Sequence, residues 1–335
     1  MSDIWGHNET QFFHELTPDM ILNSIDKIGF STTGRVLTLN SMENRVFDIE
    51  VDDEDNPFIV AKFYRPGRWS REQIKDEHTF LKDLKEEEIN VIAPLEIDGE
   101  TLFELEQHKI YFALFPKKGG RIPDELGEDK LEEIGRLLAR LHNIGEKREA
   151  SHRMSINPTT FGRTNFNALK KSEHLPHLYL EPLENLVNEI CDHIDPLFEG
   201  LKTHRIHGDC HRSNLIYREN EGNYLVDFDD MLVGPAIQDI WLVVPGDDEE
   251  AKRDRLYLLE HYETFRDFNY SELKLIEPLR ALRYIHFATW MSKRWEDPAF
   301  KQAFPYFGSE EYWSGLIRDL HEQKHKILGV DHLYL

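Results

Sequence analysis

Cysteine is nearly absent from this 335-residue sequence, which contains only Cys191 and Cys210. Two thiols exclude a disulfide framework and a four-thiolate zinc site. Long apolar runs are missing too, because the most hydrophobic stretch, 279–295, is interrupted by Arg280, Arg283, Lys293 and Arg294. Such a stretch is too polar to span a bilayer, and the first residues lack the basic and apolar segments of a signal peptide. We therefore expect a soluble cytoplasmic protein with no membrane partner.

Positive charge is scarce as well: 40 lysines and arginines face 63 acidic residues, for a formal charge of −23. This balance disfavours non-specific binding to nucleic acids, which are polyanions. An acidic protein can still bind ATP if lysine, backbone N–H groups and Mg²⁺ form a local pocket. A hydrophobic fraction of 40% argues against extended disorder, and the length fits one large domain or two lobes.

The first third of the sequence has the pattern of β-strands. Arg45–Val51 and Phe58–Tyr64 are β-rich runs on either side of an Asp/Asn/Pro turn, which predicts an antiparallel hairpin. Ser70 and Gln73 form a capping-box pattern, so a helix should begin there. Another strand, Ile110–Phe115, is followed by Pro116 and two glycines. This segment is the best candidate for a boundary between lobes.

Beyond that boundary the pattern becomes helical. Apolar residues recur at helical spacing in 131–141 and again in 183–194, and the sequence after about residue 247 also reads as helix. Between them, Asn214–Tyr217 and Tyr224–Asp227 predict a second hairpin. We therefore expect an α+β chain with a two-lobed, protein kinase-like fold: a small β-rich nucleotide-binding N-lobe (1–115) and a large α-helical catalytic and substrate-binding C-lobe (116–335).

Lys62 is an unusual residue for an apolar strand. Strand alternation places it on the face of Phe58, Val60 and Tyr64, where an ammonium needs a partner. Glu77 falls within the apolar stripe of the next helix and needs a cation. A Lys62–Glu77 pair would satisfy both and leave Lys62 able to contact phosphate, and losing Lys62 could then cost about 3–5 kcal/mol. A purely structural ion pair, or a snorkelling lysine on an edge strand, would give the same pattern.

The segment His207–Asn214 and the later Val226–Asp230 carry the second group of candidate residues. Asp209 can accept a proton from a hydroxyl nucleophile, while Asn214 and Asp227 offer oxygen atoms to Mg²⁺. Phosphoryl transfer needs such a base together with a metal that offsets phosphate charge. A zinc or manganese site formed by His207, Asp209 and His211 is a competing interpretation. It leaves Lys62, Asn214 and Asp227 unexplained.

These motifs resemble the catalytic and metal-binding loops of protein kinases. The His-Gly-Asp-x-His form is closer to the aminoglycoside phosphotransferase and choline kinase branch of that fold. Across nearly the whole chain the sequence is most similar to the bacterial stress response kinase A (RdoA-like) family. The segments that carry this similarity are Asn40–Val46, Ala61–Pro66, Gly234–Trp241, Glu277–Ala281 and Arg294–Phe300.

The resemblance implies an ATP-dependent serine/threonine protein kinase, cytoplasmic and monomeric, linked to bacterial envelope and oxidative stress. Its partners would be protein substrates with serine or threonine acceptors, and its cofactors ATP and Mg²⁺. Asp209 takes the proton-acceptor position of the family, and Asn214 and Asp227 take the magnesium positions, with Asp227 also counted as catalytic.

The resemblance also assigns residues around the nucleotide. Lys62 takes the position of the phosphate-contacting lysine, Glu77 that of its partner, and Ser41 lies in the loop over the phosphates. Asp239 resembles a buried aspartate that braces the catalytic loop by accepting backbone N–H bonds.

The sequence departs from the protein kinase pattern in three places. No Gly-x-Gly-x-x-Gly precedes Lys62, so the loop 39–45 must cover the phosphates without glycine, and we infer that Ser41 makes that contact. Gly208 replaces an arginine that pairs with an activation-loop phosphate in many protein kinases. Only eleven residues separate Asp227 from Asp239, which leaves little room for an activation segment.

Two other functions therefore stay open. A small-molecule kinase for an amino alcohol or aminoglycoside would suit the short segment and the acidic surface. A nucleotide-binding sensor without turnover is the alternative that is not an enzyme.

Overall fold

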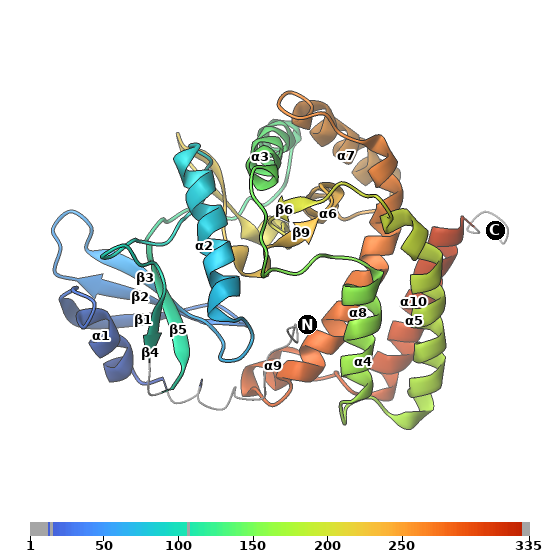
Figure 1. Ribbon diagram of the computed structural model, residues 1–335, viewed down its shortest axis with the longest axis horizontal. Helices are drawn as coiled ribbons and strands as arrows, with labels where there is room; N and C mark the ends of the chain where they lie inside the picture. The colour runs from blue at the N-terminus through green and yellow to red at the C-terminus, as the bar shows by residue number, and fades with distance from the viewer. Residues whose placement is uncertain (1–12, 14–15, 106–107, 330–335) are drawn as a thin grey trace. The chain divides into compact units, whose positions relative to one another are not determined.

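A five-stranded antiparallel sheet forms the N-terminal part of the chain, in the strand order β1-β2-β3-β5-β4 (Figure 1). The computed structural model describes residues 13, 16–105 and 108–329. The strands are β1 (Thr32–Leu39), β2 (Arg45–Val51), β3 (Phe58–Phe63), β4 (Phe103–Leu105) and β5 (Ile110–Pro116). The predicted hairpin is confirmed, with β2 and β3 paired from Arg45 opposite Phe63 to Glu50 opposite Phe58.

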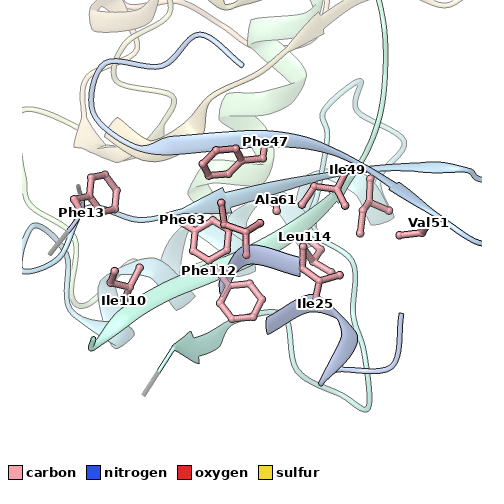
Figure 2. Packing of buried hydrophobic residues seen from close by; sticks show 12 residues of the cluster. Phe13, Ile25, Phe47, Ile49, Val51, Ala61, Phe63, Ile110, Phe112 and Leu114 are labelled. Carbon is pink, nitrogen blue, oxygen red and sulfur yellow. The ribbon is translucent and has the colours of Figure 1, made fainter. Parts of the chain in front are cut away.

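The two faces of this sheet have different partners because side chains alternate along each strand. From β3, Ile59, Ala61 and Phe63 point into an apolar core with Phe112 of β5 (Figure 2). Helix α1 (Pro18–Asp26) covers this face and contributes Ile21 and Ile25 to the same core. Lys62 and Tyr64 therefore project from the opposite face.

Helix α2 (Arg71–Glu86) packs on that opposite face, where Ile74 joins Tyr64 and Ala113 in a smaller apolar cluster. The predicted capping box is confirmed: Ser70 Oγ accepts the Gln73 N–H, and the Gln73 side chain accepts the Ser70 N–H. The cap at Ser70 fixes where α2 begins, and with it the position of Glu77 about two turns later.

The chain forms two compact units. The first contains the described residues of Met1–Arg153, Asp209–Met231 and Leu242–Asp267. Besides the sheet it holds α3 (Glu128–Glu146), the hairpin β7 (Leu215–Arg218) to β8 (Gly222–Leu225), and α7 (Glu249–Tyr262). The second hairpin was predicted to extend to Asp227, but β8 ends at Leu225 because the backbone of Asp227 is left-handed (φ 62°, ψ 66°) and cannot continue a strand.

The second unit contains the described residues of Met154–Gly208, Leu232–Trp241 and Phe268–Leu335. It is mainly helical, and α8 packs against α4 and α10, while α10 also packs against α5 (Figure 1). A short two-stranded sheet pairs β6 with β9. The elements are α4 (Asn165–Lys170), α5 (His177–Phe198), β6 (His204–Ile206), β9 (Leu232–Gly234), the start of α6 (Ile237–Val243), α8 (Ile276–Arg294), α9 (Pro298–Ala303) and α10 (Glu310–Leu328).

This composition confirms the predicted fold class, an α+β chain whose N-terminal part is a β-sheet and whose C-terminal part is helical. The helices predicted over 131–141 and 183–194 are confirmed as parts of α3 and α5. The boundary predicted between residues 115 and 116 stays a prediction. Within the described part of the chain, every helix is too short or too polar to cross a lipid bilayer.

Candidate active site

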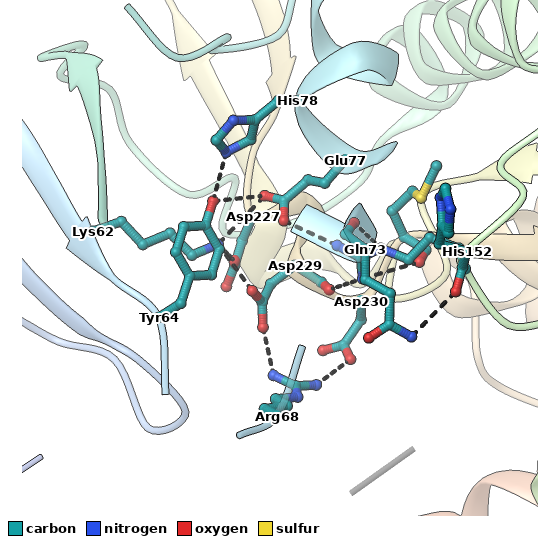
Figure 3. Close-up of polar contacts among 12 residues, drawn as sticks. Lys62, Tyr64, Arg68, Gln73, Glu77, His78, His152, Asp227, Asp229 and Asp230 are labelled. Atoms are coloured by element: carbon teal, nitrogen blue, oxygen red, sulfur yellow. Dashed lines mark hydrogen bonds and ion pairs between the residues drawn. The ribbon is translucent and has the colours of Figure 1, made fainter. Parts of the chain in front are cut away.

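Lys62 lies at the centre of the candidate site, which is built from residues of the first unit. Its Nζ atom is 3.3 Å from Asp227 Oδ1, 3.3 Å from Asp229 Oδ1 and 3.6 Å from Glu77 Oε1 (Figure 3). The predicted Lys62–Glu77 ion pair is therefore confirmed, but it is one of three. Strand β3 thus brings a lysine to carboxylates from α2 and from the segment after the second hairpin.

The carboxylates keep Lys62 protonated. Burial by itself would lower the pKa of this lysine, but Asp229, Glu77 and Asp227 outweigh it and raise the pKa well above the ordinary value. The ammonium group also lies 4.9 Å from the centre of the Tyr64 ring. The site therefore presents a fixed positive charge over the whole physiological pH range, as a residue that contacts phosphate requires.

Glu77 has a second cationic partner that the sequence did not predict. Its Oε2 atom accepts a hydrogen bond of 3.1 Å from Arg153 Nη2, and both side chains are almost fully buried. Arg153 also donates to the backbone oxygens of Gln73 (2.8 Å) and Asp229 (2.7 Å). Arg153 therefore links helix α2 to the segment after β8. Arg153 lies in an irregular segment, where no periodic sequence pattern marks it as a core residue.

Asp227 combines a left-handed backbone with an accessible side chain. Its φ of 62° is in the left-handed region, which is uncommon for a residue other than glycine, asparagine or aspartate. The next residue, Phe228, is buried and packs edge-on against Phe80 of α2 at 5.9 Å, which anchors the turn. The Asp227 side chain remains 56% exposed, so its carboxylate is available to a ligand.

Asp209 and Asn214 lie on one loop before β7. Asn214 Nδ2 donates to the backbone oxygen of Asp209 at 2.9 Å, and Asn214 O accepts the N–H of Val226 at 3.0 Å. Because the amide nitrogen is the donor in the first bond, Oδ1 is the atom that can coordinate a metal. Asp209 Oδ2 is 3.3 Å from His211 Nε2. The loop is thus tied to the segment that precedes Asp227.

The donor set fits a magnesium ion. Burial and the neighbouring carboxylates Asp229, Asp209 and Asp227 raise the pKa of Asp230 to about 6, against the opposing effect of Arg68. Burial is the largest cause of this shift, and the three carboxylates that add to it are negative charges that a divalent cation would offset. Mg²⁺ uses one or two carboxylates together with phosphate oxygens and water, and Asp227 and Asn214 are the oxygen donors that would hold it here.

The alternative metal site at His207, Asp209 and His211 has less support. Among the residues that the structure describes, no group of three or more histidine, cysteine, aspartate or glutamate side chains is arranged to hold a metal ion. His207 is fully buried. His211 lies beside Asp209, where it forms an ion pair whenever the imidazole is protonated.

Ser41 lies in the loop between β1 and β2, and its hydroxyl accepts the N–H of Asn44 at 3.3 Å. Asn44 Oδ1 in turn accepts the N–H of Arg65 at 3.1 Å. The buried Arg65 guanidinium donates to the backbone oxygens of Glu43 (2.9 Å) and Met42 (3.2 Å). The Arg65 side chain therefore fixes the backbone of this loop, which contains no glycine.

In the second unit, Asp239 braces the backbone that leads into Asp209. Its two carboxylate oxygens accept the N–H groups of His207 (2.9 Å) and Gly208 (2.8 Å), which confirms the structural role predicted for this buried aspartate. Gly208 has a φ of 85°, a left-handed conformation that an arginine would adopt only with strain. Glycine at this position is therefore explained by the backbone.

The chain is similar in sequence to a known enzyme family and to named bacterial proteins. Residues 36–276 match the family model for the phosphotransferase enzyme family. "Stress response kinase A" of Escherichia coli O157:H7 is 37% identical over 311 residues, covering 92% of both chains. "Serine/threonine protein kinase RdoA" of Salmonella typhimurium is 36% identical over 333 residues, covering 98% of both.

Solved structures share the fold at lower sequence identity. A structure of an amicoumacin kinase in complex with AMP-PNP, Ca²⁺ and Ami superposes with a TM-score of 0.73 at 17% identity, covering 93% of each chain. A microcompartment-associated aminopropanol kinase gives 0.65 at 19% identity, over 90% of this chain and all of the other. The choline kinase LicA from Streptococcus pneumoniae gives 0.60 at 15% identity, over 91% and 97% of the chains.

Proposed function

Because the chain belongs to the phosphotransferase enzyme family, we propose that it is an ATP- and Mg²⁺-dependent serine/threonine protein kinase of the bacterial stress response. One observation carries the proposal: Lys62 of β3 meets Asp227 at 3.3 Å, although 165 positions separate them in the sequence. A lysine that can contact phosphate and a carboxylate that can hold metal are the parts that phosphoryl transfer needs side by side.

Each of these residues has a separate role in the proposed phosphoryl transfer. Lys62 offers its fixed positive charge to the phosphates, and Glu77 with Arg153 keeps that lysine in place. Asn214 and Asp227 would hold Mg²⁺, which offsets charge on the transferred phosphoryl group. Asp209 orients the acceptor hydroxyl and accepts its proton at a carboxylate oxygen.

A protein acceptor is supported by the relatives that cover nearly the whole chain, which are named as a stress response kinase and as a serine/threonine protein kinase. The three solved neighbours named for small acceptors are 17%, 19% and 15% identical, which shows the fold alone.

Phosphoamino acid analysis after incubation with γ-labelled ATP and Mg²⁺ tests the proposal. The native chain and the Asp209→Asn variant are compared, with a generic basic protein as acceptor. We expect label on serine or threonine that is lost in the variant. Label that never leaves ATP, under any acceptor condition, would refute kinase activity, and nucleotide binding without turnover would favour a sensor.

A small-molecule kinase is the second candidate, favoured by the short path from Asp227 to Asp239. A 3₁₀ turn (Phe228–Asp230), strand β9 and the start of α6 occupy most of its residues. Little chain is left to form an activation segment or peptide platform. ADP release measured with choline, 1-amino-2-propanol and an aminoglycoside distinguishes the candidates. Turnover stimulated by one of them, without label on protein, would replace the protein kinase assignment.

A further inference from the structure

Arg68 lies between β3 and α2 and is 5% exposed, which is unusual for an arginine in a connecting segment. One terminal nitrogen of its guanidinium group donates to Asp229 and the other to Asp230 (Figure 3). Both carboxylates belong to the turn that directly follows Asp227. A planar guanidinium with two nitrogens on two carboxylates fixes the turn in orientation as well as in distance.

The same guanidinium also reaches the loop between β1 and β2. Its Nε atom lies 3.5 Å from Glu43 Oε1, and that oxygen is 3.3 Å from Arg65 Nε. Glu43 is therefore shared by two buried arginines. Through Glu43, Arg68 connects the loop that was predicted to cover the phosphates with the turn that was predicted to hold the metal.

The charge of this connection is permanent. Burial alone would lower the pKa of Arg68, but Asp230, Glu43 and Asp229 raise it above its ordinary value. Asp229 is 3% exposed and also contacts Lys62 at 3.3 Å, so Arg68 and Lys62 share one buried carboxylate. Any displacement of Arg68 would move a residue that contacts the proposed phosphate-binding lysine.

We propose that Arg68 is a positioning residue that holds Asp227 in its metal-binding orientation and couples it to the loop between β1 and β2; the inference rests on the proposed function. In this role Arg68 acts through its contacts with Asp229, Asp230 and Glu43. A purely structural ion pair would stabilise the fold without affecting the Mg²⁺ dependence of nucleotide binding.

The effect of Arg68→Gln on Mg²⁺ binding distinguishes a positioning role of Arg68 from a purely electrostatic role, because the two roles predict opposite changes. Removing a positive charge beside a cluster of carboxylates should strengthen attraction of Mg²⁺ if charge is all that matters. Loss of orientation should instead weaken Mg²⁺ binding. Removing a direct partner of a metal ligand typically costs roughly 10–100-fold in metal affinity, and Arg68, which bonds the two residues Asp229 and Asp230 close after the ligand Asp227, should cost about 10-fold, the lower end of that range. Arg68→Lys keeps the positive charge but loses the planar group whose two nitrogens contact Asp229 and Asp230. A positioning role therefore predicts weaker Mg²⁺ binding, and a purely electrostatic role predicts no change.

The experiment measures binding of AMP-PNP by calorimetry at a series of MgCl₂ concentrations, with thermal melting recorded for each variant. Arg71→Gln is the control, because Arg71 has a side chain that is 41% exposed and lies 3.7 Å from Glu100. We expect the MgCl₂ concentration for half-maximal binding to rise about 10-fold for Arg68→Gln and Arg68→Lys. Arg71→Gln should match the native chain.

The outcomes separate this inference from the proposed function. AMP-PNP binding by the native chain that does not depend on Mg²⁺ would overturn the proposed function and the inference with it. Mg²⁺-dependent binding by the native chain that is unchanged or strengthened in a folded Arg68→Gln variant would overturn the inference alone. If that variant fails to fold, Arg68→Lys decides, and a native Mg²⁺ response there would overturn the inference.

Discussion

Replacing Arg153 by methionine should destabilise the fold more than replacing Lys62 by methionine. Arg153 has a fully buried side chain that donates to Glu77 and to three backbone oxygens, at 2.7 to 3.4 Å. Without it, Glu77 keeps only the Lys62 ammonium at 3.6 Å as a cationic partner among these contacts, and the three oxygens lose a donor. Breaking a buried pair in this way costs about 3–5 kcal/mol of unfolding free energy.

Lys62→Met should cost less than its place in an apolar strand suggests. From sequence alone, the loss of Lys62 was expected to leave Glu77 unpaired at about 3–5 kcal/mol. In the structure Glu77 retains Arg153, and Asp229 retains Arg68. We therefore expect a loss of about 1–2 kcal/mol, the range of an ordinary substitution.

Urea denaturation followed by circular dichroism measures both costs, and γ-labelled ATP measures phosphotransfer. Arg148→Met is a matched control, because Arg148 has a side chain that is 60% exposed and lies 3.5 Å from Asp83; it should stay within about 0.5 kcal/mol of the native chain. Lys62→Met should lose phosphotransfer while remaining folded. If Lys62→Met destabilises as much as Arg153→Met, Glu77 depends on Lys62 and the reasoning is wrong.

Four further predictions concern individual residues. Asp209→Asn should lower turnover roughly 10²–10⁴-fold with ATP binding retained; full activity in a kinetic assay would exclude Asp209 as base. Asp227→Ala should remove the Mg²⁺ dependence of nucleotide affinity, measured by titration with and without Mg²⁺. Gly120→Ala should cost about 1–3 kcal/mol in urea melts, because a Cβ there would overlap Ile216; an unchanged midpoint would contradict this packing. Burial lowers the pKa of His78 to about 3, and Lys62 adds to the effect. As the pH falls below the ordinary pKa of 6.5, His78 therefore binds a proton in the unfolded chain but stays neutral in the folded chain. At pH 5 this should cost about 2 kcal/mol relative to pH 7.5, and His78→Gln should remove that part of the pH dependence.

The parts of the fold that sequence predicted well are those that local rules determine. The β2–β3 hairpin follows from alternation and a turn, and the start of α2 follows from the Ser70–Gln73 capping box. Alternation also grouped Lys62 with Phe58, Val60 and Tyr64 on one face of the strand, and the structure shows that the main core lies on the other face. These features depend on residues close together in the chain, which is why a sequence pattern is enough to locate them.

The ionic partners at the site were not predictable in the same way. Arg153 is 76 positions from Glu77, and Arg68 is 161 positions from Asp229. Both arginines lie in irregular segments, where a charged residue is ordinarily solvated. Which cation meets which buried carboxylate is set by tertiary packing, so the sequence showed that Glu77 needs a cation but named Lys62 alone. The left-handed backbone of Asp227 likewise depends on Phe228 packing against α2.

The glycine-free loop between β1 and β2 shows how such tertiary contacts bear on function. Glycine-rich loops lose more conformational freedom than others when they become ordered around phosphates. Here Arg65 already binds the oxygens of Met42 and Glu43, and Ser41 closes the turn by accepting the N–H of Asn44. A loop ordered before the nucleotide arrives loses less entropy on binding. Because the same contacts make the conformation of the loop depend on Arg65, substitution of Arg65 should affect nucleotide binding as much as substitutions within the loop.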